Sequence, residues 1–203
     1  MNYKQYQKSR NLAWRVLLDC KIDKLPVRVS EICKAYGIKV VSFSAAAEFI
    51  KKRRLEERTE NSDGFTFCGT IFYNNQCSPE WQRFTVAHEM GHIFLHGGFG
   101  FYNREPLADD NPLEMEANVF VSRLLGPACV LWKIGAETAD RIARACDISV
   151  QSAQWRLKRL NILYEREKIF RNKYGKSCFL QSPLEKAVYE QFSKYISENQ
   201  IKS

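Results

Sequence analysis

The chain has 203 residues, of which 45% are hydrophobic and 27% are charged. This composition is typical of a globular protein with a buried core, and it excludes a collagen, a coiled coil, a disordered chain and a small disulfide-stapled scaffold. The formal net charge of +8 permits an acidic partner such as nucleic acid, although solvated helix faces would carry the same charge.

Cysteine use and hydropathy predict a cytoplasmic protein. The seven cysteines are an odd number and include no CxxC pair, so we expect reduced, mostly buried thiols and neither a disulfide framework nor a cysteine zinc site. No apolar run approaches the roughly 18 residues that a membrane span needs, and Arg15 interrupts the one apolar stretch near the start. We therefore expect no membrane partner and no secretory leader.

The first predicted elements are short. Apolar residues recur at helical spacing from Tyr3 to about Cys20, and a second helix starts at Pro26 and ends before Gly37. Residues 38–43 predict a strand. Strong helix formers from Ala45 to Glu57 predict one further helix, whose basic run we interpret as a solvated face.

A hairpin and a longer helix follow. The turn-forming residues 61–64 precede two aromatic and β-branched runs, Phe65–Phe67 and Ile71–Tyr73, which predict a pair of strands. The sequence Ser78-Pro79 is typical of a helix start. This helix should continue to the glycine pair at 97–98, where helices commonly end.

All three histidines of the chain lie on that helix, within nine residues, and begin with the pattern HExxH. Positions four apart share one helix face, so His88 and His92 would point to one place and supply two ligands of a tetrahedral zinc ion. Glu89 lies on the adjoining face and can accept the proton of an attacking water as a general base. The pattern predicts a zinc hydrolase; histidines that only cap and pack are the alternative.

A hydrolytic zinc site needs a third protein ligand. The next predicted helix, Pro112 to about Leu125, offers Glu114 and Glu116, which lie about 200° apart around the helix axis, so only one of them can face the metal. Glu114 also fits a capping box with Asn111 as the N-cap. Spacing alone therefore does not decide which of the two glutamates is the third ligand.

His96 is the third histidine of the helix and another possible ligand. It follows His92 by four residues, and a straight helix carries it too far along the axis to share an ion with His88. We expect His96 to pack against the site or to support its ligands.

These residues identify a family resemblance. The stretch WQRFTVAHEMGH (81–92), followed by Leu95-His96, by ExxAN at 114–118 and by Leu124-Leu125-Gly126-Pro127, resembles the ImmA/IrrE metallopeptidases, and the similarity covers roughly residues 10–160. The resemblance implies a zincin-like α+β domain, mostly helical, with a small sheet beside the HExxH helix. Gly126, where the family usually has methionine, and residues 121–123, which replace an alanine-rich run, depart from the pattern without touching a ligand.

In that family the third ligand is the first glutamate of ExxAN, which corresponds to Glu114. The resemblance thus implies that His88, His92 and Glu114 hold Zn²⁺ and that Glu89 is the catalytic base. His96, Tyr102 and Asn118 are candidates for supporting the ligands or stabilising the oxyanion.

Family members are intracellular regulators of bacteria and phages that typically cleave a helix-turn-helix repressor. The implied function is a cytoplasmic, site-specific zinc endopeptidase in transcription regulation, with such a repressor as its protein substrate. The alternative is a DNA- or protein-binding regulator with a non-catalytic metal site. Glu89 favours the enzyme, because a purely structural site does not need a carboxylate beside an open metal position.

The chain beyond Pro127 predicts further helices. Residues 139–160 fit a helix-turn-helix outline with Ser149 as an N-cap, but Asp147 replaces the favoured glycine and Arg156 replaces a buried aliphatic residue. Several polar side chains could face DNA: Gln151, Gln154, Arg156, Lys158 and Arg159. A basic helix packed on a protease domain would look the same, so DNA is the less favoured partner.

We predict three parts in the chain. Residues 1–127 would form the metallopeptidase domain, residues 128–160 the helix-turn-helix-like segment, and residues 161–203 a helical extension.

Overall fold

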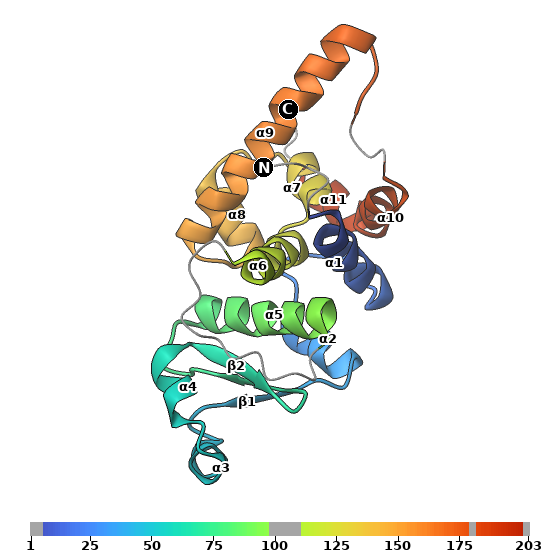
Figure 1. Ribbon diagram of the computed structural model, residues 1–203. Helices are drawn as coiled ribbons and strands as arrows, with labels where there is room; N and C mark the ends of the chain where they lie inside the picture. The colour runs from blue at the N-terminus through green and yellow to red at the C-terminus, as the bar shows by residue number, and fades with distance from the viewer. Residues whose placement is uncertain (1–5, 98–110, 179–181, 201–203) are drawn as a thin grey trace. The chain divides into compact units, whose positions relative to one another are not determined.

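The computed structural model describes residues 6–97, 111–178 and 182–200. Within these residues the chain is mostly helical with one three-stranded sheet, which confirms the predicted zincin-like α+β class (Figure 1). The chain divides into two compact units, Met1–Ser9 with Arg28–Val121 and Arg10–Val27 with Ser122–Ser203. The three-part division at residues 127 and 160 stays a prediction. None of the helices in the described ranges is long and apolar enough to cross a membrane.

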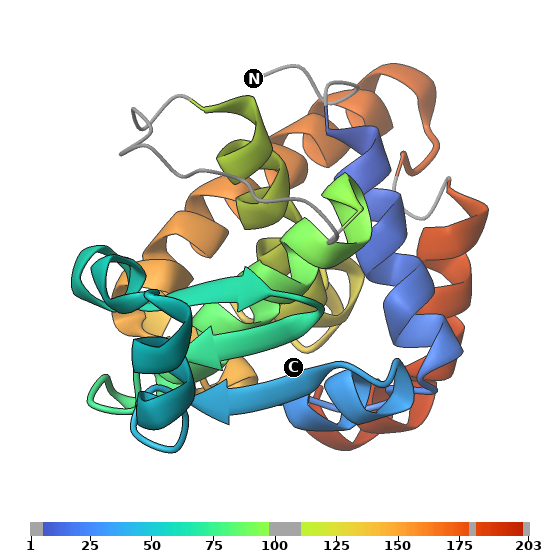
Figure 2. The same cartoon turned by 60° about the horizontal axis from the view of Figure 1, so that its bottom comes forward.

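The first unit contains the sheet, whose strands lie side by side in Figure 2. Strands β1 (Lys39–Ser42), β2 (Gly64–Phe67) and β3 (Thr70–Tyr73) are arranged in the order β1-β3-β2. β1 is parallel to β3, and β2 pairs with β3 antiparallel, so the predicted hairpin is confirmed. Its two turn residues, Cys68 and Gly69, have φ of 46° and 72°, the left-handed backbone that a two-residue hairpin turn requires.

Helices cover this sheet. They are α2 (Val29–Ala35), α3 (Ala47–Arg53), α4 (Glu56–Asn61) and α5 (Pro79–His96). The first part of α6 (Pro112–Leu125) belongs to the same unit and packs on α5. α5 contacts both strands of the hairpin and lies along one face of the sheet (Figure 1). The HExxH helix is thus held directly on the hairpin.

The bounds predicted for two short helices were wrong. α2 begins at Val29 instead of at Pro26, and the single helix expected over 45–57 is two helices, α3 and α4. Arg54 ends α3 in the left-handed conformation, with φ of 54°, and the next residue, Leu55, is buried among the aromatic residues of the hairpin. Burial of Leu55 explains the break, because a continuous helix would direct this side chain differently.

α5 begins and ends where the sequence predicted. The Ser78 Oγ accepts a hydrogen bond from the backbone N–H of Trp81 at 3.3 Å, and Pro79 is the first helical residue. Gly97 ends the helix with φ of 78°. The Trp81 indole N–H also donates to Asp63 at 2.7 Å, which ties the start of α5 to the residue before β2.

Two glycines allow neighbouring elements to approach α5 closely. A Cβ on Gly64 of β2 would lie 2.3 Å from Cγ2 of Thr85 on α5. A Cβ on Gly91, inside HExxH, would lie 2.9 Å from the buried ring of Phe120 and 3.5 Å from the Cα of Ala117, both on α6. The absence of side chains at these positions sets the separation between α5 and both of its neighbours.

The second unit is helical throughout its described part. It contains most of α1 (Gln7–Asp19) and the helices α7 (Ala128–Lys133), α8 (Ala139–Cys146), α9 (Val150–Tyr174), α10 (Pro183–Gln191) and α11 (Ser193–Asn199). The Gln191 side-chain amide donates to the backbone oxygens of Leu17 at 2.9 Å and Ile22 at 2.6 Å. Residues 183–199 thus fold back as helices onto α1, as the sequence predicted.

α8 and α9 have the predicted helix-turn-helix outline. Asp147 takes the left-handed turn conformation with φ of 50°, and the Ser149 Oγ accepts from the backbone N–H of Ser152. Arg156, however, is only 2% exposed, and its Nε donates to the Gly126 oxygen at 2.7 Å. The expectation that Arg156 could face DNA was therefore wrong, because its side chain points inward and supports the turn after α6. α9 continues without a break through residue 160.

The close approach at Gly64 gives a stability prediction. Gly64→Ala should lower the free energy of unfolding by about 1–3 kcal/mol, because the new methyl group overlaps Thr85 and neither backbone can move freely. Thr85→Ser removes the methyl group that is overlapped, so the double variant should recover part of this loss. Urea titrations of the four proteins give the comparison, and equal losses in the single Gly64→Ala and double variants would refute this packing explanation.

Candidate metal centre

The two histidines of HExxH lie side by side on α5. Their Nε2 atoms are 3.0 Å apart, and both rings are largely buried. Because the pair is four residues apart on a regular helix, no special backbone is needed to bring the two nitrogens together. The sequence expectation about their convergence is met.

Glu114 brings a carboxylate to these nitrogens from α6. One of its oxygens is 3.0 Å from the Nε2 of His88, and the other is 3.2 Å from the Nε2 of His92. Asn111 acts as the cap of α6, accepting from the backbone N–H of Leu113 at 2.9 Å. The carboxylate of Glu114 therefore faces the histidines.

This arrangement fits a tetrahedral zinc ion. One donor atom from each of His88, His92 and Glu114 lies within 4.8 Å of the other two. Ligands at about 2.0–2.1 Å from a common centre, at tetrahedral angles, lie roughly 3.3 Å from one another, close to the separations of 3.0–3.2 Å that are present. Burial lowers the pKa of His92, with an opposing effect from its hydrogen bond to Glu114, and so favours the neutral imidazole that binds metals.

The outer nitrogens of both histidines have hydrogen-bond partners. His88 Nδ1 lies 3.1 Å from Oδ1 of Asn118, which can only accept, so His88 donates from Nδ1 and keeps the lone pair of Nε2 for the cluster. Asn118 is on α6, one turn after Glu114. A single helix thus supplies both the carboxylate and the group that orients His88.

His92 is oriented by a longer chain of bonds. Its Nδ1 is 3.1 Å from Nδ1 of His96, and Nε2 of His96 is 3.0 Å from a carboxylate oxygen of Glu116. With Glu116 as the final acceptor, His96 donates from Nε2 and accepts from His92, which leaves Nε2 of His92 unprotonated. From the sequence, Glu116 was considered only as a competing metal ligand. Its role as the acceptor for His96 was not predicted, because the sequence does not show that His96 faces α6.

Glu89 is buried beside the cluster, with a residue exposure of 3%. The Thr66 hydroxyl on β2 donates to its carboxylate at 3.1 Å, and its charge acts on His92. The contact of Thr66 with Glu89 was not predicted from the sequence either. The alternation of Thr66 with Phe65 and Phe67 showed a strand, but not which face of the strand would meet α5.

The remaining candidate, Tyr102, lies outside the described residues. His96 and Asn118 lie next to the cluster as supporting groups, each bonded to one of the two histidines. The structure thus brings together six of the seven residues that were expected at the site.

Comparison with protein families matches residues 33–158 to the family described as Peptidase_M78, IrrE N-terminal-like domain. The match covers more than half of the chain and includes the whole cluster as well as α8 and the start of α9. A comparison with the curated proteins finds no match.

The cluster predicts metal binding by three named residues. We expect close to one zinc ion per chain in the purified protein, and a clear loss in His88→Ala, His92→Ala and Glu114→Ala, each of which removes one donor. Glu116→Ala removes a carboxylate from α6 without removing a donor to the ion, so it should retain zinc in stoichiometric amount although it binds the ion less tightly. Metal analysis after gel filtration measures this, and equal zinc in all five proteins would exclude the site.

The hydrogen-bond chain predicts a weaker effect on affinity. Glu116→Gln and His96→Phe should each weaken zinc binding by roughly 10- to 100-fold without abolishing it, because the orientation and basicity of His92 lose their support. Competition with a chelator gives the affinity. Unchanged zinc affinity in both variants would show that the hydrogen bonds from His92 through His96 to Glu116 do not contribute to metal binding.

Proposed function

The chain belongs to the Peptidase_M78 family, and on this basis we propose that it is a zinc-dependent endopeptidase. The observation that carries the proposal is the cluster of two imidazoles and one carboxylate with a second, buried carboxylate beside it. Three protein donors leave one position open on a tetrahedral ion, which is the arrangement of hydrolytic zinc sites.

In this proposal His88, His92 and Glu114 hold the ion. Bound zinc would supply Lewis acidity, which polarises the scissile carbonyl and makes a water acidic enough to lose its proton near neutral pH. The two histidines contribute neutral donors because their outer nitrogens are hydrogen-bonded to Asn118 and His96.

Glu89 is the general base. It takes the proton of the attacking water and passes it to the leaving amine, and the bond from Thr66 holds its carboxylate in place. Its position supports this role, since a buried carboxylate is costly unless it is used or compensated. His96 and Glu116 support His92, and Tyr102 remains a candidate donor to the oxyanion.

The proposed substrate is a helix-turn-helix transcriptional repressor, cleaved at a specific site in the cytoplasm. Support for this substrate comes from the resemblance of HExxH and ExxAN to peptidases that regulate transcription, including those borne by phages. Support for the compartment comes from the cysteines, all seven of which are free thiols.

The rival function, a DNA-binding regulator with a non-catalytic metal site, has one observation in its favour. α8 and α9 form a helix-turn-helix outline, and Gln151, Gln154 and Lys158 are exposed on α9. The burial of Arg156 removes one of the basic groups that this reading would use.

Glu89→Gln tests the enzyme directly. This variant should keep its zinc and its fold and lose peptidase activity by about 10²–10⁴-fold, because an amide cannot accept the proton of the attacking water. The proteome of the source cell serves as the substrate mixture, and mass spectrometry of new N-termini compares the wild type with the variant. We expect few cleaved proteins, with a repressor among them. Equal sets of new termini from both proteins would contradict the proposal.

A further inference from the structure

α9 carries an apolar stripe on its exposed side. Trp155, Ile162 and Ile169 are 63%, 61% and 65% exposed. They follow one another at intervals of seven residues, which is nearly two turns, so they form an almost straight line about 21 Å long. The opposite side of the same helix is buried, at Ala153 and Leu160 for example. The stripe is therefore a regular feature of a helix that is packed on its other side.

A line of basic residues accompanies the stripe. Each apolar residue is followed four positions later by a basic one: Trp155 by Arg159, Ile162 by Arg166 and Ile169 by Lys173. Residues four apart are neighbours on a helix surface, so the three basic groups lie along one flank. The other flank, three positions after each apolar residue, consists of Lys158, Glu165 and Asn172.

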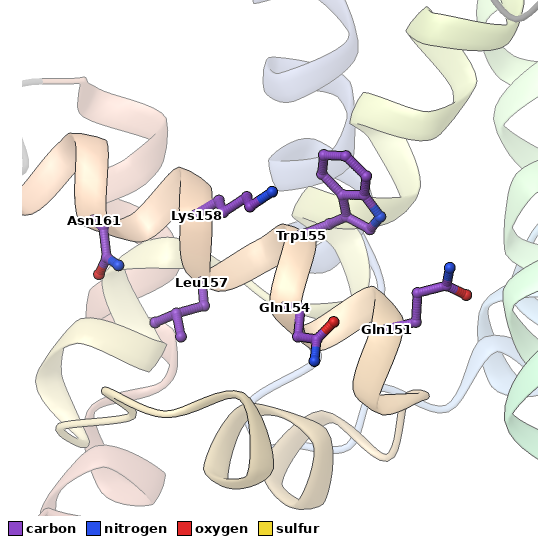
Figure 3. Close-up of a pocket in the computed structure, with 6 residues that line it drawn as sticks. All are labelled: Gln151, Gln154, Trp155, Leu157, Lys158 and Asn161. Atoms are coloured by element: carbon purple, nitrogen blue, oxygen red, sulfur yellow. The ribbon is translucent and has the colours of Figure 1, made fainter.

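An open surface depression lies at the start of the stripe. It has a volume of about 420 Å³, and its lining consists of Gln151, Gln154, Trp155, Leu157, Lys158 and Asn161, all from α9. Figure 3 shows Trp155 and Lys158 projecting from the same side of the helix, and the Nζ of Lys158 lies 4.6 Å from the centroid of the indole ring. An aromatic side chain between polar neighbours is typical of an anchor for a protein partner.

We propose that this stripe docks an acidic amphipathic helix of another protein. The apolar line supplies a seam for the apolar face of the partner, and the flank of Arg159, Arg166 and Lys173 attracts acidic side chains beside it. The inference is independent of peptidase activity, since it uses no residue of the metal centre.

Charge disfavours a second copy of the chain as the occupant, because Glu165 is the one acidic residue that borders the stripe on α9. Two copies of α9 packed antiparallel would place the basic flank of one against the basic flank of the other. A parallel pair would place it opposite Gln154, Asn161 and Lys168, which include no acid. A helix with several acidic residues complements this basic flank better than a second copy of α9 does.

The stripe also favours a protein over DNA. Phosphates would satisfy the basic flank, but they offer nothing to Ile162 and Ile169, which have no polar group to read a base. Arg156, the basic residue at the centre of the helix-turn-helix pattern, is buried.

Binding of designed peptides tests the proposal. The full chain carrying Glu89→Gln, which prevents cleavage, is titrated into a labelled helical peptide of about 20 residues with leucines at heptad spacing and glutamates on its flanks. A matched peptide has lysine at each glutamate position, and a random-sequence DNA duplex is the third probe. We expect the acidic peptide to bind at least about tenfold more tightly than the basic one, with a fall in affinity at higher salt.

Variants on α9 locate the surface. Ile162→Gln with Ile169→Gln should weaken binding of the acidic peptide about tenfold, and so should Lys173→Glu, while circular dichroism stays unchanged because these side chains are exposed. Lys194→Glu makes the same charge change at an exposed position of α11, away from the stripe, and should have little effect. Equal binding of the two peptides, no effect of the stripe variants, or tighter binding of DNA that the same variants abolish would overturn the proposal.

Discussion

The metal centre depends on the short distance between α5 and α6. The donor atoms of a metal cluster must meet within a few ångströms, and here two of them come from α5 and one from α6. The helices approach closely because Gly91 has no side chain and faces Ala117, a residue with only a methyl group, next to the buried ring of Phe120. Glu114 precedes Ala117 by one turn, so the contact that packs the helices also delivers the carboxylate to His88 and His92.

The same pair of helices fixes the protonation of the histidines. Two residues of α6 end the hydrogen bonds that start at the outer nitrogens of the histidines. Asn118 accepts from His88 directly, and Glu116 accepts from His96, which in turn accepts from His92. A donor proton on each Nδ1 leaves each Nε2 with its lone pair directed into the cluster. α6 therefore supplies three different groups within residues 114–118. Glu114 is the third donor of the cluster, Asn118 orients His88, and Glu116 supports His92 through His96.

The parts of this site that depend on local geometry are predictable from the amino-acid sequence. The convergence of His88 and His92 follows from helix periodicity, and the ends of α5 follow from Ser78, Pro79 and Gly97. The choice of Glu114 over Glu116 needed the family resemblance, since periodicity shows that the two point apart but not which one meets the histidines. Thr66 could not be found, because strand alternation does not state which face of a hairpin packs on a helix. The break at Arg54 was missed for a similar reason: the burial of Leu55 is a tertiary gain that overrides the helix propensity of its neighbours.

In the C-terminal helix-turn-helix outline, the inward face of α9 departs from the usual pattern of such motifs. The position of Arg156 normally holds an aliphatic side chain that joins the two helices, and here the guanidinium takes that interior place and donates to the backbone of Gly126. Burial of a guanidinium costs free energy of desolvation. The hydrogen bond from Arg156 to Gly126 offsets part of this cost and fixes the turn at which α6 ends. The inward face of α9 is thus committed to structure. Its outward face presents Trp155, Ile162 and Ile169 beside exposed polar residues, and apolar side chains of this kind gain most free energy when another apolar surface removes them from water.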